Sequence, residues 1–368
     1  MFKESVSMEI TRLAKIYAAQ GHKVYTLSIG DTHFTLPKTI QANFKNAIEK
    51  GYTHYLDSIG IKELRQSISE IEFKGEYKAE EILIVPGVKQ GLYYFMKAFK
   101  GKKICILEPA WLGYHSVCAM CEKEIVRVNI KNSDWLSKIE TLDFDALLLC
   151  CPNNPDGKIF NKNELETIHK IVTKKNAILI IDEIYSMYSF DADIKTILSP
   201  FYSQKNVVTV TGFSKGYAAT GLRIGCIAVH DAEILKQMNI VHQNTATCAN
   251  SLAQYAFINY QIAIPEAKEF AEYYRTNRDL ICKLLPELEQ FKPDGGFYYF
   301  INLEVFGIKN AEKFCKNLLE DKKIALVPGS AYGEGFENWL RLSFSMDRTQ
   351  LTEAIQLFKN YISTYEQQ

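Results

Sequence analysis

The feature that most constrains the fold is an alternation of short apolar runs with longer helical segments in the middle of the chain. Five runs carry β-branched and aliphatic residues without polar alternation: 103–108, 145–150, 177–182, 206–211 and 223–230. Such runs are typical of strands that are covered on both faces. Helical patterns, such as 87–99 and 162–175, separate them. This order predicts an α/β fold, with a mostly parallel sheet flanked by helices.

The pattern changes after about residue 265. A long helical stretch from 265 to about 288 is followed by short strand segments and by a terminal amphipathic helix from 347 to about 365. The strand segments are 296–303, 324–327 and 339–343. These elements predict a smaller α+β domain. We therefore predict a large domain over 36–264 and a small domain formed by 1–35 together with 265–368.

Charge and composition exclude several classes of protein. The chain has 43 basic and 43 acidic residues, so it has no general attraction for nucleic acid or an anionic membrane. Its apolar runs are shorter than the roughly 20 residues of a membrane span, and its N-terminus lacks a signal-peptide pattern. We expect a cytoplasmic protein whose nine cysteines are free thiols. Cys118 and Cys121 have the spacing of a redox pair or half a metal site, but we prefer two buried helical residues and predict no metal site.

A glycine-rich segment, 211–225, follows one of the apolar runs and contains Lys215. In parallel sheets, ligands bind beyond the carboxyl ends of the strands. Desolvation and a neighbouring cation both lower the pKa of a lysine and make its amine a nucleophile toward an aldehyde. Ser214 and Arg223 suit a phosphate group, because an arginine binds phosphate oxygens bidentately. A solvated loop lysine is the alternative interpretation.

An acid, Asp182, ends the run at 177–182. A carboxylate is costly to bury unpaired, so it needs a cationic partner. A protonated pyridine nitrogen is such a partner, and Tyr185 would then reach the oxygen on the same ring. A helix N-cap is the other interpretation of Asp182.

Other candidate residues follow further strands. Asn154 lies in a tight Asn-Pro and Asp-Gly turn after the run at 145–150. Val88 and Lys89 open the helix at 87–99 behind a glycine turn, which is a phosphate-binding geometry. Trp111 would stack on a cofactor ring or belong to the core. Arg341, centred in an apolar strand, should be paired, and a substrate carboxylate fits its planar fork.

These segments, in this order, resemble the fold-type I pyridoxal-phosphate enzymes, above all the class I/II aspartate aminotransferase family. The resemblance covers nearly the whole chain, from Ile29-Gly30-Asp31 to Arg341-Leu342-Ser343-Phe344. Its most specific parts are Gly212-Phe213-Ser214-Lys215, the following Thr220-Gly221-Leu222-Arg223-Ile224-Gly225, and Asp182-Glu183-Ile184-Tyr185. The cofactor that the resemblance implies is pyridoxal 5′-phosphate.

The resemblance also implies the role of each residue. Lys215 forms the covalent link to the cofactor and later carries the substrate proton, while Asp182 pairs with the pyridine nitrogen. Arg341 binds the substrate α-carboxylate, and Gly30 closes over it. The other cofactor contacts are Tyr185 and Asn154 at the ring oxygen, Trp111 on the ring face, and Ser214, Arg223 and the backbone at Val88 and Lys89 at the phosphate. Tyr55 reaches the phosphate in the neighbouring subunit, so the resemblance implies a homodimer with shared active sites.

Two departures bear on the substrate. Many members of the family carry Ser or Thr at the position of Lys89, and in a branch with lysine there it meets the distal carboxylate of the substrate. Lys89 therefore indicates a dicarboxylic amino acid such as aspartate or glutamate, with an exposed helical lysine as the alternative. The usual Gly-Glu-Pro-Asp-Phe appears as Gly30-Asp31-Thr32-His33-Phe34, which argues against plain aspartate specificity.

We expect transfer of an amino group between an L-amino acid and a 2-oxo acid. A lyase, decarboxylase or racemase on the same scaffold is the alternative, because the cofactor residues do not separate these reactions. The donor, the acceptor and the pathway do not follow from the sequence.

Overall fold

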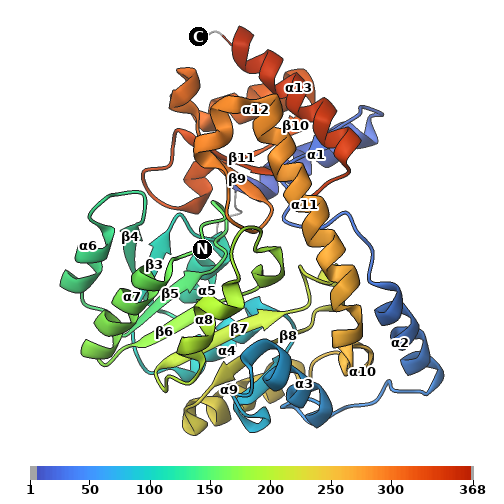
Figure 1. Cartoon of the computed structure of the whole chain (residues 1–368), viewed down its shortest axis with the longest axis vertical. Helices are drawn as coiled ribbons and strands as arrows, with labels where there is room; N and C mark the ends of the chain where they lie inside the picture. The colour runs from blue at the N-terminus through green and yellow to red at the C-terminus, as the bar shows by residue number, and fades with distance from the viewer. Residues whose placement is uncertain (1–5, 366–368) are drawn as a thin grey trace.

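The computed structural model describes residues 6–365 and centres on a seven-stranded sheet (Figure 1). The strands lie in the order β2-β8-β7-β6-β5-β3-β4. Their bounds are β2 Ile82–Val85, β3 Lys103–Glu108, β4 Glu124–Asn129, β5 Ala146–Cys150, β6 Ile178–Asp182, β7 Val207–Gly212 and β8 Gly225–Val229. Only β8 runs against its neighbours; the pairs from β7 across to β4 are parallel. The predicted α/β fold with a mostly parallel sheet is confirmed.

Helices cover both faces of this sheet, because side chains along its strands alternate between two apolar clusters. Ile180 faces the cluster that contains α4, α5 and α9, whereas Leu179 and Ile181 face the cluster that contains α3, α6, α7 and α8. The bounds of these helices are α3 Lys62–Phe73, α4 Val88–Ala98, α5 Leu112–Met120, α6 Trp135–Thr141, α7 Lys162–Lys174, α8 Ile194–Tyr202 and α9 Ala232–Ala246. The strands are therefore buried on both sides, and polar groups gather at their ends.

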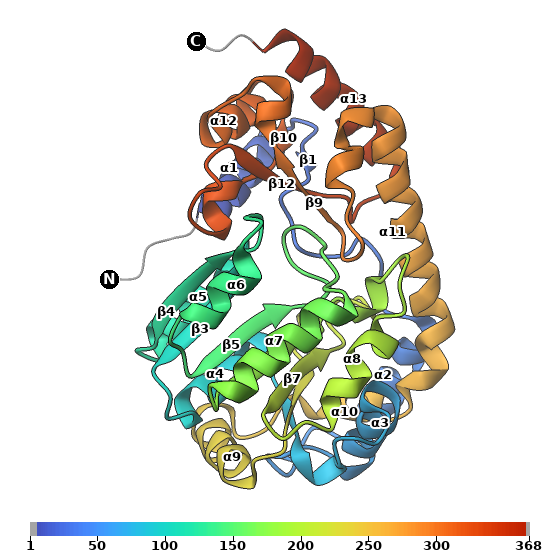
Figure 2. The same ribbon diagram turned by 60° about the vertical axis from the view of Figure 1, so that its left-hand side comes forward.

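The C-terminal part of the chain forms a second, smaller layer beside the carboxyl ends of the large sheet (Figure 2). The long helix α11, Ile264–Leu284, runs from one part to the other. The antiparallel strands β9 Tyr298–Asn302, β12 Trp339–Ser343 and β11 Val327–Pro328 pack with the helices α12 Ala311–Lys322 and α13 Arg348–Thr364. The smaller strands and the terminal helix expected after residue 265 are thus present.

The first described residues join the C-terminal part. β1, Tyr25–Thr26, pairs in parallel with β10, Ile324–Ala325, and α1, Val6–Ala19, packs beside β10 and β11. Two further helices, α2 Lys38–Glu49 and α10 Ser251–Phe257, pack on each other. The boundaries proposed from the sequence, 36–264 against 1–35 with 265–368, stay a prediction.

Three properties concern cysteines, metals and membranes. Cys118 and Cys121 are buried on or just after α5, and burial raises the pKa of both thiols. Within residues 6–365, no group of three or more His, Cys, Asp or Glu side chains is arranged to hold a metal ion. Over the same residues, every helix is too short or too polar to span a lipid bilayer.

Candidate active site

Lys215 lies in the loop after β7, at the edge of the sheet that faces the C-terminal part. Its Nζ donates a hydrogen bond to the backbone oxygen of Gly30, and no carboxylate among the described residues pairs with it. Burial, opposed by the charge of Asp31 and assisted by those of Arg341 and Arg223, lowers the pKa of the Lys215 amine to about 8. The neutral amine, which is the form that attacks an aldehyde, is therefore far more abundant near physiological pH than in an ordinary lysine.

Asp182 ends β6, the strand next to β7, and is 2 % exposed. Its carboxylate accepts hydrogen bonds from the Tyr114 hydroxyl at 2.8 Å and from the Ile184 backbone N–H at 3.0 Å. Burial raises the pKa of Asp182 to about 6. No cation among residues 6–365 forms an ion pair with it. A buried acid without a cationic partner fits a ligand that carries one.

Arg341, in the centre of β12, reaches across to the large sheet. One Nη donates to the Asn154 side-chain oxygen at 3.2 Å and the other to the Ser28 backbone oxygen at 2.7 Å. The guanidinium is 5 % exposed, and its carbon lies 4.2 Å from the centre of the Tyr298 ring. Its Nε has no partner among the described residues. A buried guanidinium with a free donor and no carboxylate is prepared for an anionic ligand.

Asn154 and Tyr185 lie between Arg341 and Asp182. The Asn154 amide donates to the Tyr185 hydroxyl at 3.4 Å, and that hydroxyl is 3.0 Å from the hydroxyl of Tyr298. Asn154 and Tyr185 are both buried, at the carboxyl ends of adjacent strands. The structure thus brings together the two polar groups that the resemblance assigns to the ring oxygen.

A cradle of cations and backbone N–H groups forms the opposite end of the site. Arg223 has a left-handed backbone, with a φ of 53°, and its side chain donates to the backbone oxygens of Thr220 at 2.8 Å and Pro86 at 3.4 Å. It lies against Gly87, where an added Cβ would come within 2.5 Å of an Arg223 nitrogen. The close approach requires glycine immediately before α4, so Arg223 sits beside the helix N-terminus that begins at Val88. This is a phosphate-binding arrangement.

Trp111 and Lys89 line the same end. Trp111 packs edge-on against the Tyr114 ring, with centroids 5.3 Å apart, and Lys89 Nζ lies 4.9 Å from the centre of the Trp111 indole. Partial burial and the Arg223 charge lower the pKa of Lys89. Ser214 is buried next to Lys215. Tyr55, in contrast, is 83 % exposed and has no hydrogen bond to the site within the described chain.

Several contacts were not predicted from the sequence. They involve tyrosines: Tyr114 bonds Asp182, Tyr298 bonds Tyr185, and Tyr188 donates to the Lys215 backbone oxygen at 2.9 Å. In the sequence, Asp31 was noted only as part of the motif Gly30-Asp31-Thr32-His33-Phe34. In the structure, the charge of its carboxylate opposes the lowering of the Lys215 pKa. The position of Tyr114, one helical turn after Trp111, is the single signal that would have pointed to the site.

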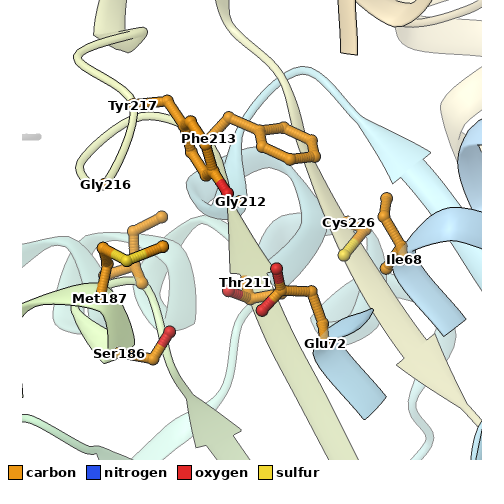
Figure 3. A pocket seen from close by; sticks show the side chains of 11 residues that line it. Ile68, Glu72, Ser186, Met187, Thr211, Gly212, Phe213, Gly216, Tyr217 and Cys226 are labelled. Atoms are coloured by element: carbon orange, nitrogen blue, oxygen red, sulfur yellow. The ribbon is translucent and has the colours of Figure 1, made fainter. Parts of the chain in front are cut away.

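A separate pocket lies beside the Lys215 loop (Figure 3). Gly212, Phe213, Gly216 and Tyr217 of that loop line it, together with Ile68, Glu72, Ile184, Ser186, Met187, Thr211 and Cys226. Its lining includes none of Lys215, Asp182 and Arg341. The three residues on which the candidate active site depends therefore lie outside this pocket.

An α/β scaffold with a lysine of lowered pKa, a buried acid and a buried arginine at one sheet edge defines a class of enzyme that reacts amines with carbonyl groups. The model of the aminotransferase class I and II family matches residues 22–358. The chain therefore belongs to this family of fold-type I enzymes, and its activity is that of an aminotransferase.

Relatives from several organisms agree with this membership. The chain is 32 % identical to an aspartate aminotransferase of Pyrococcus abyssi, over 94 % of this chain and 93 % of the relative. It is 30 % identical to aromatic-amino-acid aminotransferase 2 of Thermococcus litoralis, over 92 % and 91 %. Among solved structures, the aspartate aminotransferase of Thermus thermophilus with maleate has a TM-score of 0.88 and 26 % identity, with 97 % of each chain covered.

Proposed function

We propose that the protein holds pyridoxal 5′-phosphate on Lys215 and moves an amino group between an L-amino acid and a 2-oxo acid. The observation that carries the proposal is the placement of Lys215 and Asp182 at the carboxyl ends of two adjacent strands, Lys215 in the loop after β7 and Asp182 at the end of β6. One is an amine with a pKa lowered to about 8, the other a buried acid without a cationic partner among the described residues. A ring with an aldehyde and a basic nitrogen satisfies both.

The remaining residues fit the other parts of this cofactor. When bound, the pyridoxal ring supplies an electron sink for the electron pair of the substrate Cα–H bond. Asp182 would hold the ring nitrogen, and its burial strengthens that attraction. The residues that would complete the contacts are Tyr185 and Asn154 at the ring oxygen, Trp111 on the ring face, and Ser214, Arg223 and the backbone at Val88 and Lys89 at the phosphate.

The proton is carried by Lys215 Nζ. An amine with a pKa of about 8 both accepts and returns a proton readily near neutral pH, which is the condition for general acid–base catalysis. Its hydrogen bond to the Gly30 backbone oxygen holds Nζ next to the segment that is expected to close over the substrate. Arg341 would orient the amino acid by its α-carboxylate, using the Nε–H that has no partner in the described structure.

We further infer a homodimer in which Tyr55 of one subunit reaches the phosphate of the other. The 83 % exposure of this large aromatic side chain supports a role outside its own subunit. A cytoplasmic location is part of the proposal as well, because all nine cysteines are unpaired thiols, as expected in a reducing compartment.

For the substrate we propose a dicarboxylic amino acid, aspartate or glutamate, with Lys89 as the partner of the distal carboxylate. Lys89 is exposed, carries no ion pair among the described residues and lies over Trp111 beside Arg223. A cation with no carboxylate partner in this position supports an acidic ligand. The relatives named as aspartate aminotransferases agree with this proposal.

The test is a set of half-reactions on the purified protein with bound cofactor. Aspartate or glutamate should bleach the absorbance of the lysine-bound cofactor rapidly, and Lys89→Met should slow this reaction about tenfold or more without changing the rate with alanine. Fast reaction with aromatic amino acids alone would overturn the dicarboxylic proposal. Release of ammonia and pyruvate without any 2-oxo acid acceptor would indicate a lyase instead.

A further inference from the structure

The segment Ile29–His33 lies beside Lys215, and one tyrosine hydroxyl contacts both residues at its C-terminal end. Tyr274, a fully buried residue of α11, has its hydroxyl 2.6 Å from Thr32 Oγ1 and 3.0 Å from His33 Nδ1. The same hydroxyl accepts a hydrogen bond from the His33 backbone N–H at 3.2 Å. Three partners match the one donor and two acceptor positions of a hydroxyl, so these contacts use its whole capacity.

The N-terminal end of the segment is attached to the catalytic loop. Lys215 Nζ donates to the backbone oxygen of Gly30, and the Asp31 carboxylate accepts from the Thr220 hydroxyl at 3.0 Å. The segment therefore bridges from α11 to the loop that carries the nucleophile.

Tyr274 also reaches that loop from its other side. Its ring packs against the ring of Tyr188, with centroids 5.4 Å apart, and the Tyr188 hydroxyl donates to the Lys215 backbone oxygen at 2.9 Å. Contacts thus run from Lys215 to Gly30, along the chain to Thr32 and His33, and back through Tyr274. The positions of the segment and of Lys215 therefore both depend on the side chain of Tyr274.

Two sequence departures meet at this hydroxyl. Where the family usually has Pro and Asp in Gly-Glu-Pro-Asp-Phe, this chain has Thr32 and His33, and both hydrogen-bond Tyr274. A proline at position 32 has no side-chain hydroxyl to offer. The chain replaces the rigidity of proline with hydrogen bonds to α11.

We propose that Tyr274 is a positioning residue that fixes the segment Ile29–His33 over Lys215 and thereby sets the affinity for the amino-acid substrate. The inference rests on the proposed function, since Gly30 is the part of the segment expected to close over the substrate. Ordering this segment during binding would weaken binding; a segment already ordered by three hydrogen bonds avoids that loss.

The decisive variant is Tyr274→Phe, which removes the hydroxyl and keeps the ring. We expect KM for the amino donor to rise about tenfold while kcat changes less than about threefold, as when an interaction shared by ground and transition states is lost. The matched control is Tyr273→Phe on the same helix. The Tyr273 hydroxyl accepts from the Arg348 backbone N–H at 2.8 Å. Phenylalanine keeps the ring contact of Tyr273 with His33, with centroids 5.1 Å apart, so both constants should stay within about twofold of wild type.

A second readout uses the protein without cofactor. Hydrogen–deuterium exchange of the peptide over 27–35 should be about tenfold faster in Tyr274→Phe and unchanged in Tyr273→Phe. Thr32→Val removes one of the same contacts by another route. When Thr32→Val is added to Tyr274→Phe, it should raise KM by less than half of the effect that it has alone. The reason is that both changes break the same hydrogen bond between these two side chains.

The outcomes separate the two proposals. Wild-type exchange and wild-type KM in Tyr274→Phe would overturn the positioning role, as would equal effects of the two tyrosine variants. If Tyr274→Phe does not fold, the same exchange and KM shifts are required of Thr32→Val, and their absence overturns the role. If the wild-type protein never acquires the absorbance of the lysine-bound cofactor, the proposed function is wrong. The exchange measurement would still show whether Tyr274 orders the segment.

Discussion

Two lysines lie near opposite faces of the same sheet, and their surroundings have opposite effects on them. Lys195, in α8, lies 2.9 Å from the carboxylates of both Glu72 and Glu183. These charges hold its pKa well above the usual range in spite of its burial. Lys215 has no carboxylate partner among the described residues and donates only to the backbone oxygen of Gly30, and burial lowers its pKa to about 8.

The comparison shows that burial alone does not make a lysine reactive. Desolvation disfavours the charged amine in both places, but at Lys195 two carboxylates outweigh it. The acids follow the same division. Asp182 and Glu183 are consecutive, yet Asp182 faces the candidate active site, whereas Glu183 faces Lys195 and accepts from the Tyr202 hydroxyl at 2.8 Å. In the first cluster the lysine and the two carboxylates balance one another, whereas Lys215 and Asp182 form no ion pair among the described residues.

The largest expected effect is the loss of catalysis in Lys215→Ala. Turnover should fall on the order of 10³-fold or more, because the variant lacks both the amine that binds the cofactor and the group that carries the proton. The visible absorbance of the lysine-bound cofactor should disappear as well. Steady-state kinetics and absorbance spectra measure both effects, and full activity in this variant would refute the assignment of Lys215.

A smaller effect is expected when the stabilities of variants at the two lysines are compared. Lys195→Met should lower the free energy of unfolding of the cofactor-free protein by about 3–5 kcal/mol, because it leaves two partly or fully buried carboxylates uncompensated. Lys215→Met should cost little or stabilise, since no ion pair is lost. Urea denaturation of the two variants provides the measurement. Equal losses in both would contradict the comparison.

The smallest effect is a difference in pH dependence. The folded-state pKa of Lys215 is about 8, below the 10.5 of the unfolded chain, so the unfolded state binds more protons between these values. The stability of the cofactor-free protein relative to Lys215→Met should therefore rise from about pH 8 to 10.5. The folded-state pKa of Lys195 is raised instead, so stability relative to Lys195→Met should be constant over this range and fall above pH 10.5. Denaturation curves at several pH values test the two signs.

The sequence predicted the central strands better than the edges of the sheet. β3 has the predicted bounds, because a strand covered on both faces is a continuous apolar run. The edge strands β2 and β4 were not predicted. β4 is mostly half-buried or exposed and includes Glu124 and Arg127, so its pattern resembles a surface segment. β2 has only four residues before the turn at Pro86.

Site residues could be predicted where a charged residue stands in an apolar strand, because charged side chains are rare there. Asp182 and Arg341 were predicted on this ground. Tyr114, Tyr188 and Tyr274 were not, because the chain contains 21 tyrosines and most of those in helices belong to the core in any protein. Which hydroxyl meets which partner depends on packing between helices and loops far apart in the sequence, and no local pattern encodes it.

The adjacency of Asp182 and Glu183 makes this strand intolerant of length changes. Deleting one residue from β6 would rotate every following side chain to the other side of the sheet. Glutamate would then take the position of Asp182 beside Tyr114, aspartate would take the position of Ile181, and Ile184 would replace Glu183 as the neighbour of Lys195. Insertions and deletions inside β6 should therefore reduce activity and stability far more than those in the loop that follows. The alternation of side chains along this one strand places both the candidate catalytic acid and the acid of the internal ion pair.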